Sequence, residues 1–122
     1  MDNKAAQEKA LQMVKAVYDD GIATINGTDY KLTKLNHKIR RKIWAFYSSH
    51  APTIQAGNFG FMDSSEWDSI ESLLNDITLD GEGMQLSKVP NYWDDHAEDY
   101  LQFVATMLPV ICYPFLKGGL SS

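Results

Sequence analysis

The segment WDDHAEDY, residues 93–100, gathers the side chains best suited to acid–base or metal chemistry. Its ionisable groups belong to Asp94, Asp95, His96, Glu98 and Asp99. In a helix, Asp95 and Asp99 would share a face next to His96, an arrangement that could bind a divalent metal or act as a general base. No second cluster with ligand spacing accompanies it, because His37 lies among basic residues and His50 is isolated. We therefore expect a solvated helix face, with no metal and no cofactor.

The sequence lacks the signatures of nucleophilic catalysis and of phosphate binding. Cys112 is the only cysteine and lies in an apolar run with no activating base near it, so we interpret it as a small buried hydrophobe. The serines stand in helix-cap settings rather than in a GxSxG turn, and neither GxGxxG nor a P-loop is present. We expect no enzyme activity. Because the first residues show no secretion-signal pattern, we expect a cytoplasmic protein.

The stretch HKIRRKIW, residues 37–44, is the strongest candidate for a charged contact surface. Its cations could contact phosphates while Trp44 stacks on a base; they are Lys38, Arg40, Arg41 and Lys42. The chain is acidic, however, with a net charge of -5. The segment from Asp63 to Asp99 holds eleven acidic residues and a single Lys or Arg, Lys88. We therefore favour pairing of the basic stretch with this acidic segment, or with an acidic partner, over binding to nucleic acid.

The length of 122 residues and an average composition predict one compact domain, mainly helical with a small β-hairpin (α+β) and four helices. Apolar residues at helical spacing predict a first helix from Asp2 to about Tyr18, and Gly21 favours its end. Residues 1–20 could be a peripheral helix. The pair Asn26-Gly27 lies between β-prone runs, which predicts a hairpin within residues 22–35.

Caps and periodicity predict the middle of the chain. Asn36 caps a second helix that continues to Ala51, and Pro52 ends it. Residues 53–64 indicate a loop with buried phenylalanine anchors. A third helix begins at Ser64 or Ser65, where Ser65-x-x-Asp68 resembles a capping box. Residues 78–89 are typical of a second hairpin or an irregular turn.

The last predicted helix opens at Pro90 and Asn91 and enters a charge-free stretch, Tyr100 to Leu116, with thirteen apolar residues out of seventeen. A membrane span needs about twenty mostly apolar residues, so we favour burial in the core and expect no membrane partner. Pro109 and Pro114 predict a kink or an early end near Leu108. We expect the end, Tyr113 to Leu116, to be exposed and adhesive, and residues 113–122 could form a flexible tip.

The order of these elements is similar to that of a known family. A hairpin "NGTDYKLTKL" leads into a basic helix "HKIRRKIWAFY", then into an acidic helix "SSEWDSIESLLNDITLDG" and the ending "YWDDHAEDYLQFVATMLPVICYPFLKGG". The pattern, which covers roughly residues 22–119, resembles the tail assembly chaperones of long-tailed bacteriophages. The leading helix lies outside the resemblance.

The resemblance implies a non-enzymatic protein of the infected cell's cytoplasm that is absent from the mature virion. Such chaperones bind the long, aggregation-prone tape measure protein, keep it soluble and help tail tube protein to polymerise around it. Many members also exist in a longer, frameshifted form, and a homo-oligomer is left open. The residues we expect to contact a partner are Lys38, Arg40, Arg41, Lys42, Tyr113, Phe115 and Leu116.

Two other functional classes stay open at this point. A small acidic phage-encoded inhibitor of a host defence protein could present the acidic segment as a mimic of nucleic acid. A weak DNA-binding regulator could use the patch from Lys38 to Lys42, and its affinity would fall steeply with salt.

Overall fold

The computed structural model describes the backbone of residues 2–33 and 35–121, with side chains for residues 8–33 and 35–117. The fold is mainly helical with a small antiparallel sheet of order β1-β2-β3, so the α+β prediction of a single compact domain is confirmed. The elements are α1 (Asp2–Asp20), β1 (Ile22–Ile25), β2 (Thr28–Leu32), α2 (His37–Gln55), η1 (Gly60–Met62), α3 (Ser65–Ile77), β3 (Thr78–Leu79), η2 (Leu86–Lys88), α4 (Tyr92–Asp95), α5 (Ala97–Ile111) and α6 (Tyr113–Ser121).

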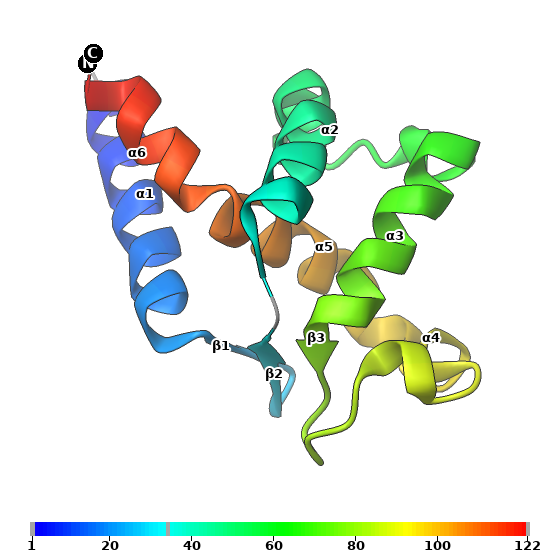
Figure 1. The fold of residues 1–122 in the computed structure, drawn as a ribbon. Helices are drawn as coiled ribbons and strands as arrows, with labels where there is room; N and C mark the ends of the chain where they lie inside the picture. Colours follow the sequence, from blue (N-terminus) through cyan, green and yellow to red (C-terminus); the bar gives the residue numbers. More distant parts are fainter. Residues whose placement is uncertain (1, 34, 122) are drawn as a thin grey trace.

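The charge-free stretch forms the centre of the molecule. Helix α5 contacts α1, α2, α4, α6 and β1, and Figure 1 shows it passing behind α2, with α1 on one side and α3 on the other. Most side chains of its second half are buried, because several neighbours pack on it, whereas Ala105 is exposed. The α5 side chains that are at most 1% exposed are Phe103, Val104, Met107, Leu108, Val110 and Ile111.

The first half of the chain follows its local signals. Helix α1 ends at Asp20, and Gly21 then takes a left-handed φ of 72°. Asn26 and Gly27 also have positive φ, 51° and 85°, as the two turn positions of a type I′ hairpin require. The hairpin pairs Ile22 with Lys31 and buries Ala23 and Ile25, so this prediction is confirmed. Its alternation sends one face of β1 into the core.

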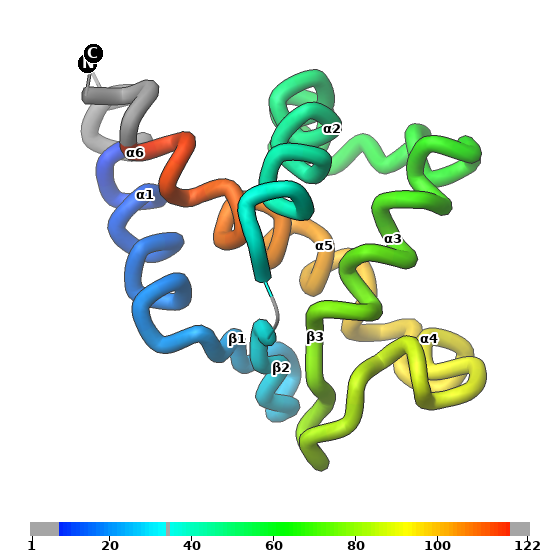
Figure 2. Tube along the Cα trace, viewed as in Figure 1, coloured from blue at the N-terminus to red at the C-terminus, as the bar shows by residue number. Residues whose placement is uncertain are grey.

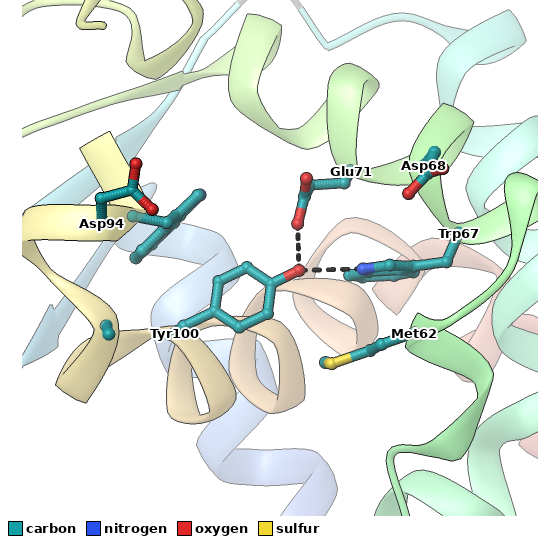
Figure 3. Close-up of a pocket in the computed structure, with 8 residues that line it drawn as sticks. Met62, Trp67, Asp68, Glu71, Asp94 and Tyr100 are labelled. Carbon is teal, nitrogen blue, oxygen red and sulfur yellow. Dashed lines mark hydrogen bonds between the residues drawn. The ribbon is translucent and has the colours of Figure 1, made fainter. Parts of the chain in front are cut away.

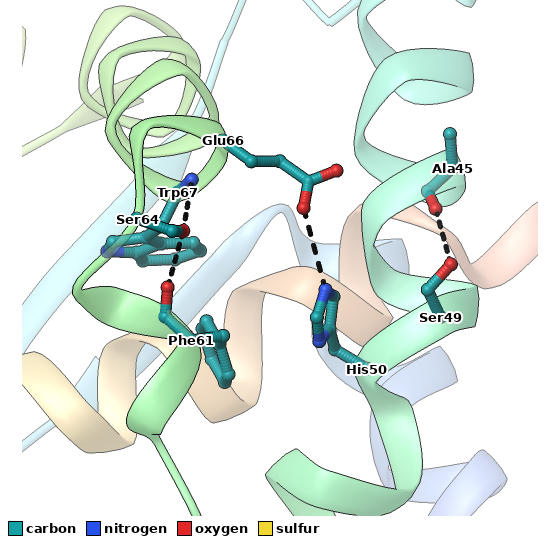
Figure 4. Close-up of polar contacts among 7 residues, drawn as sticks. All are labelled: Ala45, Ser49, His50, Phe61, Ser64, Glu66 and Trp67. Atoms are coloured by element: carbon teal, nitrogen blue, oxygen red, sulfur yellow. Dashed lines mark hydrogen bonds and ion pairs between the residues drawn. The ribbon is translucent and has the colours of Figure 1, made fainter.

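A side chain at the N-terminus of each helix caps α2 and α3, an asparagine in α2 and a serine in α3. The Asn36 side chain accepts a hydrogen bond from the Ile39 N–H at 2.9 Å, as predicted. In α3 the cap is Ser64, whose Oγ accepts from the Trp67 N–H at 3.1 Å and whose hydroxyl donates to the Phe61 carbonyl (Figure 4). The capping box expected at Ser65 is therefore wrong, because Ser65 is already the first helical residue.

The two helices that contain a proline continue beyond it, contrary to the prediction. Pro52 lies inside α2, which continues to Gln55, and Pro109 lies inside α5, which continues to Ile111. Each proline leaves the carbonyl four residues earlier without its helical donor, and Ser48 and Ala105 at those positions are exposed. Water can then hydrate the orphaned carbonyls. The expected end at Ala51 is incorrect, and so is an early end near Leu108, which was one of the two alternatives for that position.

The predicted last helix is three helices, so the described residues contain six α-helices where four were expected. The first interruption is His96, with φ -127° and ψ 35°, whose ring stacks on Tyr92 with centroids 4.2 Å apart. The second is Cys112, after which Pro114 could not donate to the Val110 carbonyl. Pro114 instead occupies the first turn of α6, where a missing N–H costs little.

Helix α6 turns back along α1, as the tube in Figure 2 shows, and Tyr113 meets Tyr18 with ring centroids 5.1 Å apart.

The segment after α3 resolves into a third strand and a tight turn. β3 pairs with β2, Leu79 bridges to Gln85, and the Asp80 carboxylate accepts from the Glu82 and Met84 N–H groups. The core thus lies between α5, the sheet and the inner faces of α2 and α3.

Candidate functional site

The acidic segment holds a buried hydrogen-bonded cluster. Asp99 is 3% exposed, and its carboxylate accepts from the Tyr30 hydroxyl and from the Asn26 amide, both at 2.8 Å. The Tyr92 hydroxyl donates in turn to the Tyr30 oxygen at 2.8 Å. Burial is the main cause that raises the pKa of Tyr30 and of Tyr92, so both phenols keep their protons.

This cluster corrects the predicted solvated helix face at Asp99, whereas Asp94, Asp95 and Glu98 are exposed as predicted. Because the helix is interrupted at His96, Asp95 and Asp99 do not share one continuous helical face, and Asp95 is exposed while Asp99 is buried. The cluster ties the turn of the hairpin to the first turn of α5. We assign it a structural role, since its polar groups bind one another inside the fold.

The basic stretch is divided between surface and structure. Lys38, Arg41 and Lys42 are exposed, whereas Arg40 is half-buried and donates from Nε to the Ile111 carbonyl at 3.0 Å. A cation at the C-terminus of α5 satisfies a free carbonyl and complements the helix dipole. Arg40 is therefore engaged inside the fold, which leaves the other three cations for a partner.

The start of the predicted tip, Tyr113 to Leu116, does not project into solvent. Tyr113 is 7% exposed, and Phe115 packs edge-on against Trp44 and His37 of α2 with ring centroids 5.8 and 6.3 Å apart. Leu116 is half-buried against the core. The expectation of an exposed tip is wrong, because the break at Cys112 lets α6 fold back onto α1 and α2. The structure thus places Phe115 against α2, the helix that carries the basic stretch.

Cys112 has the character predicted for it. Its side chain is fully buried, and burial raises the pKa of its thiol to about 12, although nearby Arg40 acts in the opposite direction. A thiol that stays protonated is a poor nucleophile. The prediction of a small buried hydrophobe is confirmed.

An apolar groove between α1 and α5 was not predicted from the sequence. It has a volume of about 270 Å³, and Met13, which lines it, is 65% exposed. On α5, Leu101 is 50% exposed and lies one helical turn before Ala105 of the groove. The groove is lined by Ala10, Met13, Val14, Val17, Ala105, Thr106, Pro109 and Val110.

One signal in the sequence pointed toward this groove. The stripe of Ala10, Val14 and Val17 marks the inner face of α1, but periodicity alone does not say which helix receives it. In the structure the receiving face carries Ala105 and Pro109, and such short side chains leave space where longer ones would fill it. The result is an apolar surface that the chain covers only in part.

No helix among the described residues has the length and apolarity needed to cross a membrane. In the same part of the chain, no group of three or more His, Cys, Asp or Glu side chains is placed to hold a metal ion. Comparison with known proteins found no family model, no curated sequence and no solved structure that matches this chain.

Proposed function

We propose that this chain is a tail assembly chaperone of a long-tailed bacteriophage, which binds and solubilises the tape measure protein during tail morphogenesis. The observation that carries the proposal is the apolar groove between α1 and α5, with Met13 exposed in its lining. The groove can serve as a binding surface, and it supports the proposal in addition to the resemblance in the order of the elements. The proposal places the protein in the host cytoplasm, outside the mature virion, with tail tube protein as a second partner.

The groove suits one apolar face of an amphipathic helix. A helix of the partner can place residues i, i+3, i+4 and i+7 into a channel bounded by two helices. Methionine adapts its shape to different apolar side chains, which favours a binder that must accept many segments of a long partner. Burying the Met13 side chain would contribute roughly 1.5 to 3 kcal/mol.

The proposal changes the roles of the expected contact residues. Arg40 and Tyr113 stabilise the fold, since one binds the Ile111 carbonyl and the other packs against Tyr18. Lys38, Arg41 and Lys42 remain exposed cations that can contact an acidic part of a partner. The main apolar contact moves from the C-terminal tip to the groove.

The experiment is co-expression with the tape measure protein of the same genome, followed by pull-down and a solubility assay. Met13→Glu and Ala105→Glu should lower affinity about tenfold or more, because each places a charge in the apolar groove. Gln12→Glu and Gln102→Glu are the matched controls. They add the same charge at exposed positions of the same helices outside the groove and should keep the complex.

Two outcomes would contradict the proposal. The tape measure protein could stay insoluble and unbound beside a folded chain, in which case binding to a host defence protein is the next measurement. Alternatively, all four variants could bind as the parent chain does, and the groove would then have no part in recognition. Circular dichroism of each variant separates loss of binding from loss of fold.

A further inference from the structure

A second, chemically different pocket lies between α3, α4 and the start of α5. It has a volume of about 380 Å³, within the usual range for ligand sites, and shares no residue with the apolar groove. Figure 3 shows its side chains, with Tyr100 between the α3 residues and the α4 side. The lining residues are Met62, Trp67, Asp68, Glu71, Trp93, Asp94, Ala97 and Tyr100.

The hydrogen-bond donors on the side chains of this pocket are already used. The Trp67 indole N–H donates to the Tyr100 oxygen at 2.8 Å, and the Tyr100 hydroxyl donates to the Glu71 carboxylate. The Trp93 indole donates away from the pocket, to Asn75 at 3.1 Å. Burial, followed by the bond to Glu71, raises the pKa of Tyr100, so this phenol stays a donor.

The acceptors, by contrast, are in excess. Three carboxylates, on Asp68, Glu71 and Asp94, line the pocket. Among the described residues none of them forms an ion pair, and only Glu71 accepts a side-chain hydrogen bond, from Tyr100. Asp68 and Asp94 are exposed. A ligand that supplies donors and positive charge can therefore pair with these carboxylates, which a neutral or anionic group cannot do.

The aromatic side chains of the pocket favour one class of cation. Trp93 and Tyr100 are half-buried and meet edge to face, with ring centroids 5.0 Å apart, so both rings contribute aromatic surface beside the carboxylates. Aromatic faces attract cations that have lost part of their water, and a guanidinium both stacks on such rings and binds carboxylates in a fork. The three carboxylates are not placed to hold a metal ion. An organic cation with a flat, multi-donor head fits these features.

We propose that this pocket receives the arginine side chain of a protein partner, with the guanidinium against the aromatic side chains of Trp93 and Tyr100 and paired with Asp94 and Asp68 or Glu71. The proposal goes beyond the chaperone function and does not depend on it. The carboxylates come from separate elements, Asp68 and Glu71 from α3 and Asp94 from α4. Recognition thus needs the packing of both elements against α5.

The test uses the full chain and three short capped peptides that differ at one central residue: arginine, lysine or citrulline. Binding is followed by NMR through the indole N–H signals of Trp67 and Trp93, with Trp44 on α2 as an internal reference. The arginine peptide should shift the Trp67 and Trp93 signals with a millimolar or tighter Kd. Citrulline keeps the shape without the charge and should not bind. The affinity should fall as salt rises.

Asp94→Asn and Asp95→Asn form the matched pair of variants, because both residues are exposed on α4 and only Asp94 lines the pocket. Asp94→Asn should weaken binding of the arginine peptide about three- to tenfold, whereas Asp95→Asn should leave it unchanged. A concentration of 10 mM peptide corresponds to roughly the weakest specific binding. If the indole N–H signals of Trp67 and Trp93 do not shift at that concentration, the proposal is overturned. Equal binding of the citrulline or lysine peptide, or equal effects of the two variants, would also overturn it.

Discussion

The buried Asp99 carboxylate depends on its hydrogen bonds. A polar group inside the core is costly unless it is paired, and Asp99 is paired with Tyr30 and Asn26. The same contacts hold the Asn26 turn, which has a positive φ of 51°, against the first turn of α5. A single side chain therefore connects two segments separated by more than half of the chain.

Replacing Asp99 by alanine should lower the free energy of unfolding by about 1 to 3 kcal/mol, because the buried Tyr30 hydroxyl loses its acceptor. Urea unfolding followed by circular dichroism measures this change. Asp95→Ala is the control, since Asp95 is exposed and should leave the unfolding midpoint unchanged. Equal shifts of the midpoint in both variants would show that Asp99 has no special structural role.

At the scale of the element, the side chain that caps a helix fixes where that helix begins. Helix α3 begins after Ser64, whose side chain receives the Trp67 N–H, and the same turn sets Trp67 into the core at 2% exposure. Nearby, His50 of α2 lies 3.6 Å from Glu66 at the start of α3, a contact visible in Figure 4. The start of α3 is thus defined by its own cap and by its packing on α2.

Ser64→Ala should destabilise the protein by about 1 kcal/mol, the usual effect of losing an N-cap side chain. Ser65→Ala is a demanding control, because Ser65 is the neighbouring exposed serine and the sequence pattern alone marks it as the cap. Thermal unfolding of the two variants should show a lower midpoint for Ser64→Ala only. A larger loss in Ser65→Ala would contradict the cap assignment.

At the scale of the whole molecule, several buried or half-buried tyrosine hydroxyls and the Cys112 thiol resist ionisation. Burial raises the pKa of Tyr30, Tyr47, Tyr92 and Tyr100, and that of Cys112 to about 12. The unfolded chain releases these protons at lower pH, near roughly 8.5 for cysteine and 10 for tyrosine. Between the unfolded and folded pKa values the native state holds more protons, so its stability falls as pH rises.

Stability should therefore be unaffected by these groups at pH 7 and should decline steadily as the pH rises above roughly 9. Urea unfolding at a series of pH values measures the decline. A spectrophotometric titration of tyrosinate provides an independent check, because the native protein should ionise fewer tyrosines at pH 11 than the unfolded chain. An unfolding free energy that stays constant to pH 11, or equal tyrosinate signals, would contradict this account.

The sequence by itself determined the elements whose signals are local. The end of α1 at Gly21, the turn at Asn26-Gly27 and the cap at Asn36 each depend on contacts within about four residues. The helical class, the hairpin and the burial of the charge-free stretch followed from these signals and from periodicity. The pairing of β3 with β2 was not predicted, since the two strands lie more than forty residues apart in the sequence.

Only the tertiary structure decided the surfaces on which function is proposed. Arg40 meets the Ile111 carbonyl across 71 positions and Asn26 meets Asp99 across 73, and no spacing rule predicts such pairs. The groove and the acidic pocket likewise join side chains of α1 with α5 and of α3 with α4. Local backbone chemistry sets where helices begin and end, whereas the packing of distant elements decides which of their side chains are buried and which remain open to a partner.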